Sequence, residues 1–271
     1  KVGIMDKTEA GAITIYGLRM HDLEGDLNFH HYGKKDQAIY SVSRGGLNLE
    51  LINIADSFEN VNFHFDYKCR KVDLKKGVVL FEHTKTKSRI EVKADLTFGA
   101  DGAFSAIRTS MQKTPRFNYS QQYLEYGYKE LSIPPGPQGA HLIEKNALHI
   151  WPRGHFMLIA LPNFDGSFTC TLFLPYEGDE GFDQLNREDQ IKAFFEKHFP
   201  DTIPLMPELV SDFQQNPTGS LVTVRCNPWQ YDHKFLLIGD ASHAIVPSYG
   251  QGINSGFEDC TILDELLDEY E

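Results

Sequence analysis

Short stretches of alternating hydrophobic and polar residues predict strands in the first third of the chain. AITIYGLRM (12–20) is rich in β-branched and aromatic residues, and further strands are predicted around NFHHYG (28–33) and AIYSVSR (38–44). Apolar residues after Arg44 are instead spread over the faces of a helix, which we predict to begin there. Four runs then follow with Lys/Gly turns between them and predict an antiparallel meander: VNFHFDY, KCRKVDL, GVVLFEH and SRIEVKA, within 61–94.

The rest of the chain passes from an α/β pattern to a β-rich one and back. The mostly apolar run from Leu96 to Ala100 predicts a buried strand that leads into a serine-initiated helix. A β-rich block follows over 122–176, where several runs, such as HFMLIALP, are apolar on both faces. NREDQIKAFFEKHFP predicts an amphipathic helix, LVTVRC and FLLIGD predict strands, and a last helix is predicted from Gly252. This order predicts one domain interrupted by a second.

The composition excludes several classes of function. A formal net charge of −12 argues against nucleic-acid binding, because a surface for phosphates would oppose the field of the protein itself. The four cysteines are scattered and no histidine pair has metal spacing, so we expect free thiols and no metal site. No apolar stretch approaches the roughly 20 residues that cross a bilayer, and we expect the chain alone to be soluble. Neither end reads as a natural boundary, which indicates a fragment of a longer protein.

Two segments share one design, in which an apolar strand is followed by glycine, aspartate, small residues and a helix. They are FGADGAFSAIR (98–108) and IGDASHAIVPSYGQGINSGFED (238–259), and neither contains a Gly-x-Gly-x-x-Gly turn or a phosphate loop. In doubly wound α/β sheets, ligands bind outside the carboxyl ends of strands, where a carboxylate can accept hydrogen bonds from ligand hydroxyls. A helix beginning at Gly252 would offer free N–H groups and a positive dipole end to a ligand that is or becomes negative. The alternative is that Asp101 and Asp240 only cap the helices of ordinary turns.

These two motifs resemble the Asp-Gly and Gly-Asp motifs of the flavin-dependent aromatic hydroxylases, the single-component FAD monooxygenases. SVSRGGLN, PRFNYSQQY, ALHIWPRGHFMLIALPN and SFTCTLF are similar, within that group, to the kynurenine 3-monooxygenase family. The resemblance implies an α/β fold of the aromatic hydroxylase type, in which an incomplete Rossmann-like FAD-binding domain is interrupted by a β-sheet substrate domain. It implies FAD-binding parts in 1–115, with some of the substrate sheet, and in 219–271, and a β-rich substrate domain in 116–218.

The resemblance also implies an activity and a set of site residues. The activity is the hydroxylation of L-kynurenine to 3-hydroxykynurenine with FAD, NADPH and dioxygen, and the flavin rather than any side chain carries the chemistry. Asp240 would bind the ribityl chain of FAD, and the backbone of Ile253 and Asn254 would bind its pyrimidine edge. Arg44, Asp101, Arg108 and Gly252 complete the implied cofactor site. The implied substrate residues are Arg19, Tyr32, Leu148, Ile159, Leu161, Phe173, Pro247 and Gln251. Without the resemblance, the strand residues among them would read as ordinary core and Tyr32 as a hairpin tyrosine.

Departures from the family pattern leave alternatives open. An ungapped match puts Leu18 where the family carries a substrate-binding arginine, with Arg19 one residue later, and a one-residue slip on a strand reverses the face of a side chain. Ser248-Tyr249 replaces two phenylalanines in the implied pocket wall. The unit that holds the FAD pyrophosphate is absent, as is the C-terminal anchor that places eukaryotic members on the mitochondrial outer membrane, facing the cytosol. There are two alternatives: another aromatic hydroxylase that acts on a phenolic acid, and an inactive flavin-fold fragment that binds no cofactor.

Overall fold

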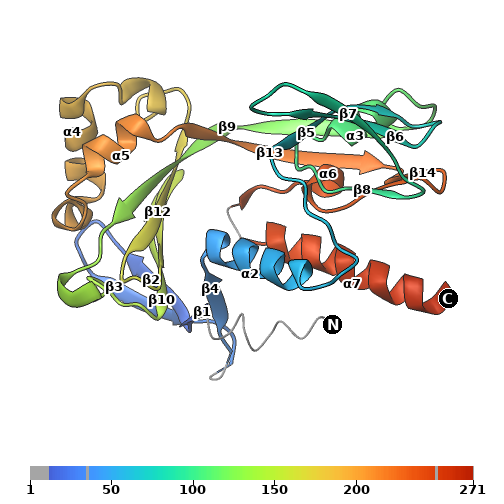
Figure 1. Cartoon of the computed structure of the whole chain (residues 1–271). Coiled ribbons are helices and arrows are strands. Elements are labelled where there is room, and N and C mark those ends of the chain that lie inside the picture. Colours follow the sequence, from blue (N-terminus) through green and yellow to red (C-terminus); the bar gives the residue numbers. More distant parts are fainter. Residues whose placement is uncertain (1–11, 35–36, 248–249, 271) are drawn as a thin grey trace. The chain divides into compact units, whose positions relative to one another are not determined.

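The computed structural model describes residues 12–34, 37–247 and 250–270, which form two compact units (Figure 1). Unit 1 takes the described residues up to Val61 together with Glu125–Ser220. Unit 2 takes Asn62–Leu124 together with the described residues from Leu221 onward. Two long strands, β9 (Asn118–Ile133) and β13 (Thr218–Asn227), continue from one unit into the other.

A seven-stranded sheet organises unit 1, with the strand order β13-β9-β12-β11-β10-β2-β3. β2 pairs with β10 in parallel, while β3 pairs with β2, and β10, β11, β12 and β9 pair with one another, in the antiparallel sense. A separate antiparallel pair joins β1 to β4, so the single strand predicted over 12–20 is split at Tyr16, where the chain passes from one sheet to the other. The bounds are β1 Ala12–Ile15, β2 Gly17–His21, β3 Leu27–His31, β4 Ile39–Val42, β10 Ala147–Arg153, β11 Phe156–Pro162 and β12 Phe168–Pro175.

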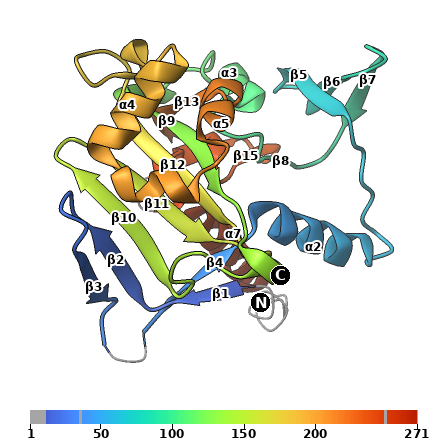
Figure 2. The same cartoon turned by 90° about the vertical axis from the view of Figure 1, so that its left-hand side faces the viewer.

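Helices cover one face of this sheet (Figure 2). They are α4 (Glu188–His198), the 3-10 segment η3 (Pro200–Leu205) and α5 (Leu209–Gln215). The buried positions of α4 recur every three or four residues, at 191, 194, 195 and 198, which is the spacing of one helix face and confirms the predicted amphipathic helix. Burial alternates along β10 and β11, because successive side chains point to opposite faces of the sheet. One face packs against the helices, and the other is half-buried.

The remaining helical segments of unit 1 are short or peripheral. α2 (Arg44–Asp56) begins where it was predicted, with Ser43 Oγ accepting the N–H of Gly46 at 3.2 Å, and it has no buried residue. Two 3-10 turns, η1 (Pro137–Gly139) and η2 (Phe182–Gln184), lie in connections of the sheet.

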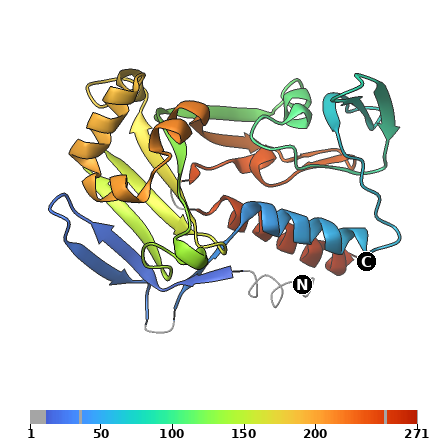
Figure 3. The same cartoon turned by 60° about the vertical axis from the view of Figure 1, so that its left-hand side comes forward.

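The described residues of unit 2 form two three-stranded sheets and three helices, the longest of which is α7 (red in Figure 3). The predicted meander is present as β5 (Tyr67–Asp73), β6 (Val78–His83) and β7 (Arg89–Lys93). The other sheet has the order β14-β15-β8, with β15 and β8 parallel. Its strands are β14 (Gln230–Tyr231), β15 (Phe235–Leu237) and β8 (Thr97–Gly99), and the helices are α3 (Ala106–Met111), α6 (Asp240–His243) and α7 (Gly252–Tyr270).

Two predicted strands of unit 2 differ from the structure. Residues 61–66 form no strand; Phe63 and Phe65 stack on each other at 5.6 Å between ring centroids, because their alternating pattern finds no partner strand. The strand predicted as buried over 96–100 is β8 at the edge of its sheet, and Phe98 is 42% exposed. Only the face of Gly99 is covered there, by Leu237 and Ile107.

Candidate functional site

The second strand-end acid, Asp240, follows β15 directly and projects from the first residue of α6. Gly239, the residue before it, has φ +58°, a backbone conformation that residues other than glycine rarely adopt. Asp240 is exposed, and its carboxylate makes no hydrogen bond or ion pair with any residue that the structure describes. A β-carbon placed on Gly239 would meet nothing within 4 Å, so the turn is open on the side to which a side chain would project. The carboxylate is therefore free to accept hydrogen bonds from a ligand.

The first turn of α7 is also open. The helix begins at Gly252, as predicted, and β-carbons added at Gly250 and Gly252 would meet nothing within 4 Å. Ile253 is 44% exposed and Asn254 is exposed as well. The first N–H groups of an α-helix have no partner inside the helix, so this end is a site for an acceptor or an anion.

Two residues to which the sequence assigned no role hold α7 against the turn of Asp240. Asp259 Oδ2 accepts the backbone N–H of Gly239 and a hydrogen bond from His243 Nε2, each at 2.7 Å. On the same side of the helix, Gly256 lies next to Gly239, since a β-carbon on Gly256 would be 3.8 Å from the Gly239 Cα. Positions 252, 256 and 259 share one helix face, and this spacing is the signal that could have identified the contact.

The first strand-end acid, Asp101, caps a helix. Asp101 Oδ2 accepts the backbone N–H of Ala106 at 2.7 Å at the start of α3, where Ser105 Oγ also accepts the N–H of Arg108 at 2.9 Å. Arg108 itself is buried and donates to the carbonyl oxygens of Ala241 and Ala103. Both predicted cofactor residues are therefore engaged in holding unit 2 together, and their contact with a nucleotide stays a prediction.

The structure gathers four of the predicted substrate residues on one face of the seven-stranded sheet. Ile159 pairs with Ile150 on one side and Thr171 on the other, and Phe173 pairs with Met157 two positions along. Because side chains alternate along a strand, the four share the face that the helices do not cover. They come from β10, β11 and β12, and all but Phe173 are only half-buried: Leu148, Ile159, Leu161 and Phe173.

Arg19 is not brought to this face. Leu18 pairs with Leu148, whereas Arg19 pairs with His149, which is buried on the helix-covered side. The Arg19 guanidinium donates to Glu144 at 2.9 Å and lies 4.7 Å from the ring centroid of Phe29. Arg19 therefore lies on the sheet face opposite to Leu148, and its role in substrate binding stays a prediction.

Tyr32 lies just after β3, where its backbone N–H donates to Tyr16 O at 2.9 Å. Burial raises the pKa of its phenol, so the hydroxyl stays a hydrogen-bond donor at neutral pH. Arg44 is exposed at the start of α2, in unit 1 like Tyr32. Pro247 and Gln251 are exposed in unit 2, and Ser248-Tyr249 between them lies outside the described residues.

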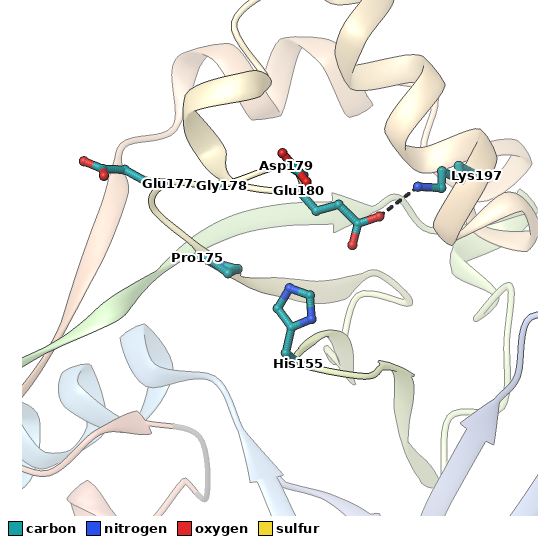
Figure 4. Close-up of a pocket in the computed structure, with 7 residues that line it drawn as sticks. All are labelled: His155, Pro175, Glu177, Gly178, Asp179, Glu180 and Lys197. Carbon is teal, nitrogen blue, oxygen red and sulfur yellow. Dashed lines mark hydrogen bonds and ion pairs between the residues drawn. The ribbon is translucent and has the colours of Figure 1, made fainter.

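One hollow of unit 1 is lined by other residues than these (Figure 4). It has a volume of about 540 Å³ and is formed by the loop after β12, the β10–β11 turn and the end of α4. Glu180 within it accepts from Lys197 at 2.8 Å and from His198 at 2.9 Å, and the first of these bonds lowers the pKa of Glu180. None of the predicted site residues lines it: His155, Pro175, Glu177, Gly178, Asp179, Glu180 and Lys197 do.

Comparison with known proteins places this architecture in a family. The model of the family described as FAD binding domain matches residues 51–270. The chain belongs to this family. Its relatives include proteins named kynurenine 3-monooxygenase from Flavobacterium johnsoniae, 49% identical over 99% of this chain, from Dictyostelium discoideum, 47% identical over 99%, and from Sus scrofa, 40% identical over 99%. The chain spans 60%, 58% and 56% of their respective lengths.

Solved structures at low sequence identity show the same fold. A variant of 2-methyl-3-hydroxypyridine-5-carboxylic acid oxygenase superposes with a TM-score of 0.75 at 19% identity, covering 99% of this chain and 68% of that one. A tetracycline destructase superposes with a TM-score of 0.62 at 20% identity, covering 94% and 64%. The predicted fold class, an aromatic hydroxylase fold, is thereby confirmed.

Two further features bear on the predicted partners. No group of three or more histidine, cysteine, aspartate or glutamate side chains in the described part of the chain could hold a metal ion. Within the same part, every helix is too short or too polar to cross a membrane.

Proposed function

We propose that this chain is part of an FAD- and NADPH-dependent aromatic hydroxylase that converts L-kynurenine to 3-hydroxykynurenine with dioxygen. The observation that carries the proposal is the meeting of Leu148, Ile159, Leu161 and Phe173 on one uncovered sheet face. Relatives named for this reaction, 49% identical over 99% of the chain, support it.

The residues present in unit 2 fit one end of FAD. Asp240 has a carboxylate that no described residue pairs with and that could accept from the ribityl hydroxyls, and the open first turn of α7 offers N–H groups for the pyrimidine edge. Asp259 would fix these two elements relative to each other through Gly239 and His243. No Gly-x-Gly-x-x-Gly sequence is present for the pyrophosphate, so the other end of FAD would need residues beyond this chain.

The residues of unit 1 would bind and orient the substrate. The apolar sheet face would pack against an aromatic ring and exclude water, while the Tyr32 phenol would donate a hydrogen bond to a carboxylate. When bound and reduced by NADPH, FAD supplies the reaction with dioxygen that hydroxylates the ring. For a eukaryotic protein with an anchor segment, we extend the proposal to the outer mitochondrial membrane.

A chimeric enzyme tests the proposal. This chain would replace the matching 269-residue stretch of the Flavobacterium johnsoniae relative, so that the missing parts of the cofactor site are supplied. We expect a yellow protein with bound FAD in which NADPH oxidation depends on kynurenine and yields an equal amount of 3-hydroxykynurenine. Asp240→Asn should lower FAD affinity about tenfold, since the ribityl hydroxyls then donate to a neutral amide oxygen instead of a charged carboxylate, while Asp268→Asn at the exposed end of α7 should not.

Three outcomes would count against the proposal. Hydrogen peroxide without hydroxylated product, at full FAD occupancy, would contradict productive chemistry on kynurenine. Hydroxylation of a phenolic acid in preference to kynurenine would favour the alternative, another aromatic hydroxylase. Leu18 supports this alternative, because it lies on the sheet face at the position where the family carries an arginine. A colourless chimera would favour the inactive flavin fold.

A further inference from the structure

A chain of four hydrogen-bonded side chains lies on the helix-covered side of the sheet in unit 1. His21 ends β2, His149 and Trp151 belong to β10, and Asp201 lies in η3. His21 Nε2 is 2.9 Å from His149 Nδ1, and His21 Nδ1 is 3.0 Å from Asp201 Oδ2. Both imidazoles and the indole are buried, with exposures of 5%, 2% and 0% for His21, His149 and Trp151. None of these residues belongs to the predicted site.

The donor and the acceptor of each hydrogen bond can be assigned by starting at His149. The carbonyl oxygen of Glu144 can only accept, and it lies 2.8 Å from His149 Nε2, so that nitrogen carries a proton. Burial lowers the pKa of His149 to about 4, so the ring is neutral and its Nδ1 is an acceptor. The proton between the two rings must therefore be on His21 Nε2.

Starting from the Asp201 end, the same reasoning requires a second proton on the His21 ring. Asp201 Oδ2 accepts the Trp151 indole N–H at 2.8 Å. Burial favours the neutral carboxyl, but the hydrogen bonds from His21 and Trp151 outweigh it and lower the pKa of Asp201 below its usual value. An ionised Asp201 can only accept, so His21 Nδ1 must also donate. A neutral imidazole has one N–H, whereas these contacts require two.

We propose that His21, His149 and Asp201 form a buried proton-holding relay, in which His21 is an imidazolium that ties β2 and β10 to η3 in the folded chain. If the proton leaves, either a lone pair of His21 faces the Asp201 carboxylate or two lone pairs face each other between the rings. Each alternative breaks one bond of the relay. The relay is thus a pH-sensitive device, and it acts on β2, whose Leu18 lies on the opposite, half-buried face of the sheet.

The surrounding charges are consistent with one cation held at this place. On β10, Arg153 donates to the His21 carbonyl at 2.9 Å and to other backbone carbonyls, and Asp201, Asp22 and Glu24 lie near its charge. Arg19 and Glu144 lie near His149 and pair with each other at 2.9 Å. Asp201 is then the one carboxylate in direct contact with the His21 ring, and its Oδ1 is buried without a partner among the described residues.

A route for the proton exists. His21 borders an open cavity of about 340 Å³ at the β2–β3 hairpin, together with Met20, Asn28, His30 and Arg153. We assign proton exchange between the relay and solvent to this cavity.

Nitrogen NMR of the histidine-labelled chain tests the proton count. At about pH 6 to 7 we expect both ring nitrogens of His21 to be protonated and His149 Nδ1 to be unprotonated. In Asp201→Asn the imidazolium loses its counter-charge, so one nitrogen of His21 should become unprotonated at the same pH. An unprotonated ring nitrogen on His21 in the unmodified chain at about pH 6 would overturn the proposal.

Denaturant unfolding at several pH values tests the device. The contribution of the relay to the free energy of unfolding should be fully present below the pKa of a histidine in an unfolded chain, about 6.5. It should be lost as the pH rises and His21 releases its proton. Between about pH 6 and 9 the folding equilibrium constant should fall about tenfold more in the unmodified chain than in His21→Gln.

His141→Gln is the matched control, because His141 lies in the same unit and contacts the Asn163 carbonyl at 2.8 Å outside the relay. It should keep the pH dependence of the unmodified chain. If His21→Gln does not fold, Asp201→Asn replaces it in the same measurement and should likewise lose the excess pH dependence. Equal pH dependence in the relay variant and the unmodified chain would overturn the proposal.

Discussion

At the scale of single residues, the sharpest constraint is the backbone of Gly239. Its φ of +58° and ψ of −143° lie in a region that is essentially restricted to glycine, although a β-carbon would meet nothing within 4 Å. Gly239→Ala should therefore destabilise unit 2 by about 1–3 kcal/mol through backbone strain alone. Gly252→Ala is the control, because the position is helical and equally open, and its free energy of unfolding should be unchanged or slightly higher. Denaturant midpoints compare the two, and equal midpoints for Gly239→Ala and the unmodified chain would contradict the argument.

Single residues also show how far a sequence motif reaches. Asp101 and Asp240 stand in similar motifs, yet the first caps α3 and the second is free, because only Asp101 is followed at a suitable distance by a helix start whose N–H groups it reaches. Arg19 could not be placed from the sequence, since its face depends on the register with β10, a contact made across more than a hundred residues. The relay of His21 and Asp201 depends on a similar long-range contact and has no local signature.

At the scale of elements, the contact between α7 and the β15–α6 turn makes a second prediction. Asp259→Ala leaves the Gly239 N–H and the His243 imidazole without their shared acceptor, on a side chain that is 13% exposed. We expect a loss of about 1–3 kcal/mol in the free energy of unfolding, measured with urea. Asp259→Asn should recover part of it, because its single carbonyl oxygen can accept one of the two bonds. The neighbouring exposed side chain provides the control, and Glu258→Ala should change stability by less than about 0.5 kcal/mol. A loss as small in Asp259→Ala would show that α7 is not held by this contact.

Elements with a strong local period were predictable, and those that depend on a partner were not. α4 and strands β10 to β12 lie where the pattern places them, because their own residues supply a buried stripe or an apolar run. α7 also begins at the predicted Gly252, although its described residues are half-buried or exposed. The run at 61–66 has the alternation of a strand but no neighbour to pair with, and it stays a loop. β8 is apolar like a central strand, yet it has one partner and exposes Phe98.

At the scale of the whole molecule, the sequence predicts the order of α/β and β-rich parts but not the positions at which the chain passes from one unit to the other. Unit 1 gains its first strands because β2 pairs in parallel with β10, and no local pattern encodes that pairing. The units share two continuous strands, β9 and β13, which contribute Leu131 and Ile133 to the core of unit 1 and Val224 to the buried residues of unit 2. Neither unit can lose these strands without disturbing the other.

This sharing predicts a single unfolding transition, and the chain carries a reporter in each unit. Of its two tryptophans, Trp151 is buried in unit 1 and Trp229 is 39% exposed in unit 2. Trp229→Phe leaves the first as the only source of indole fluorescence, and Trp151→Phe leaves the second. In each variant the fluorescence midpoint in urea should coincide with the far-UV circular dichroism midpoint of the same variant, as a cooperative transition requires. Comparing two signals within one variant cancels the cost of the substitution, which for Trp151→Phe includes the hydrogen bond to Asp201. Fluorescence and dichroism midpoints that separate in either variant would show that the units unfold independently in spite of their common strands.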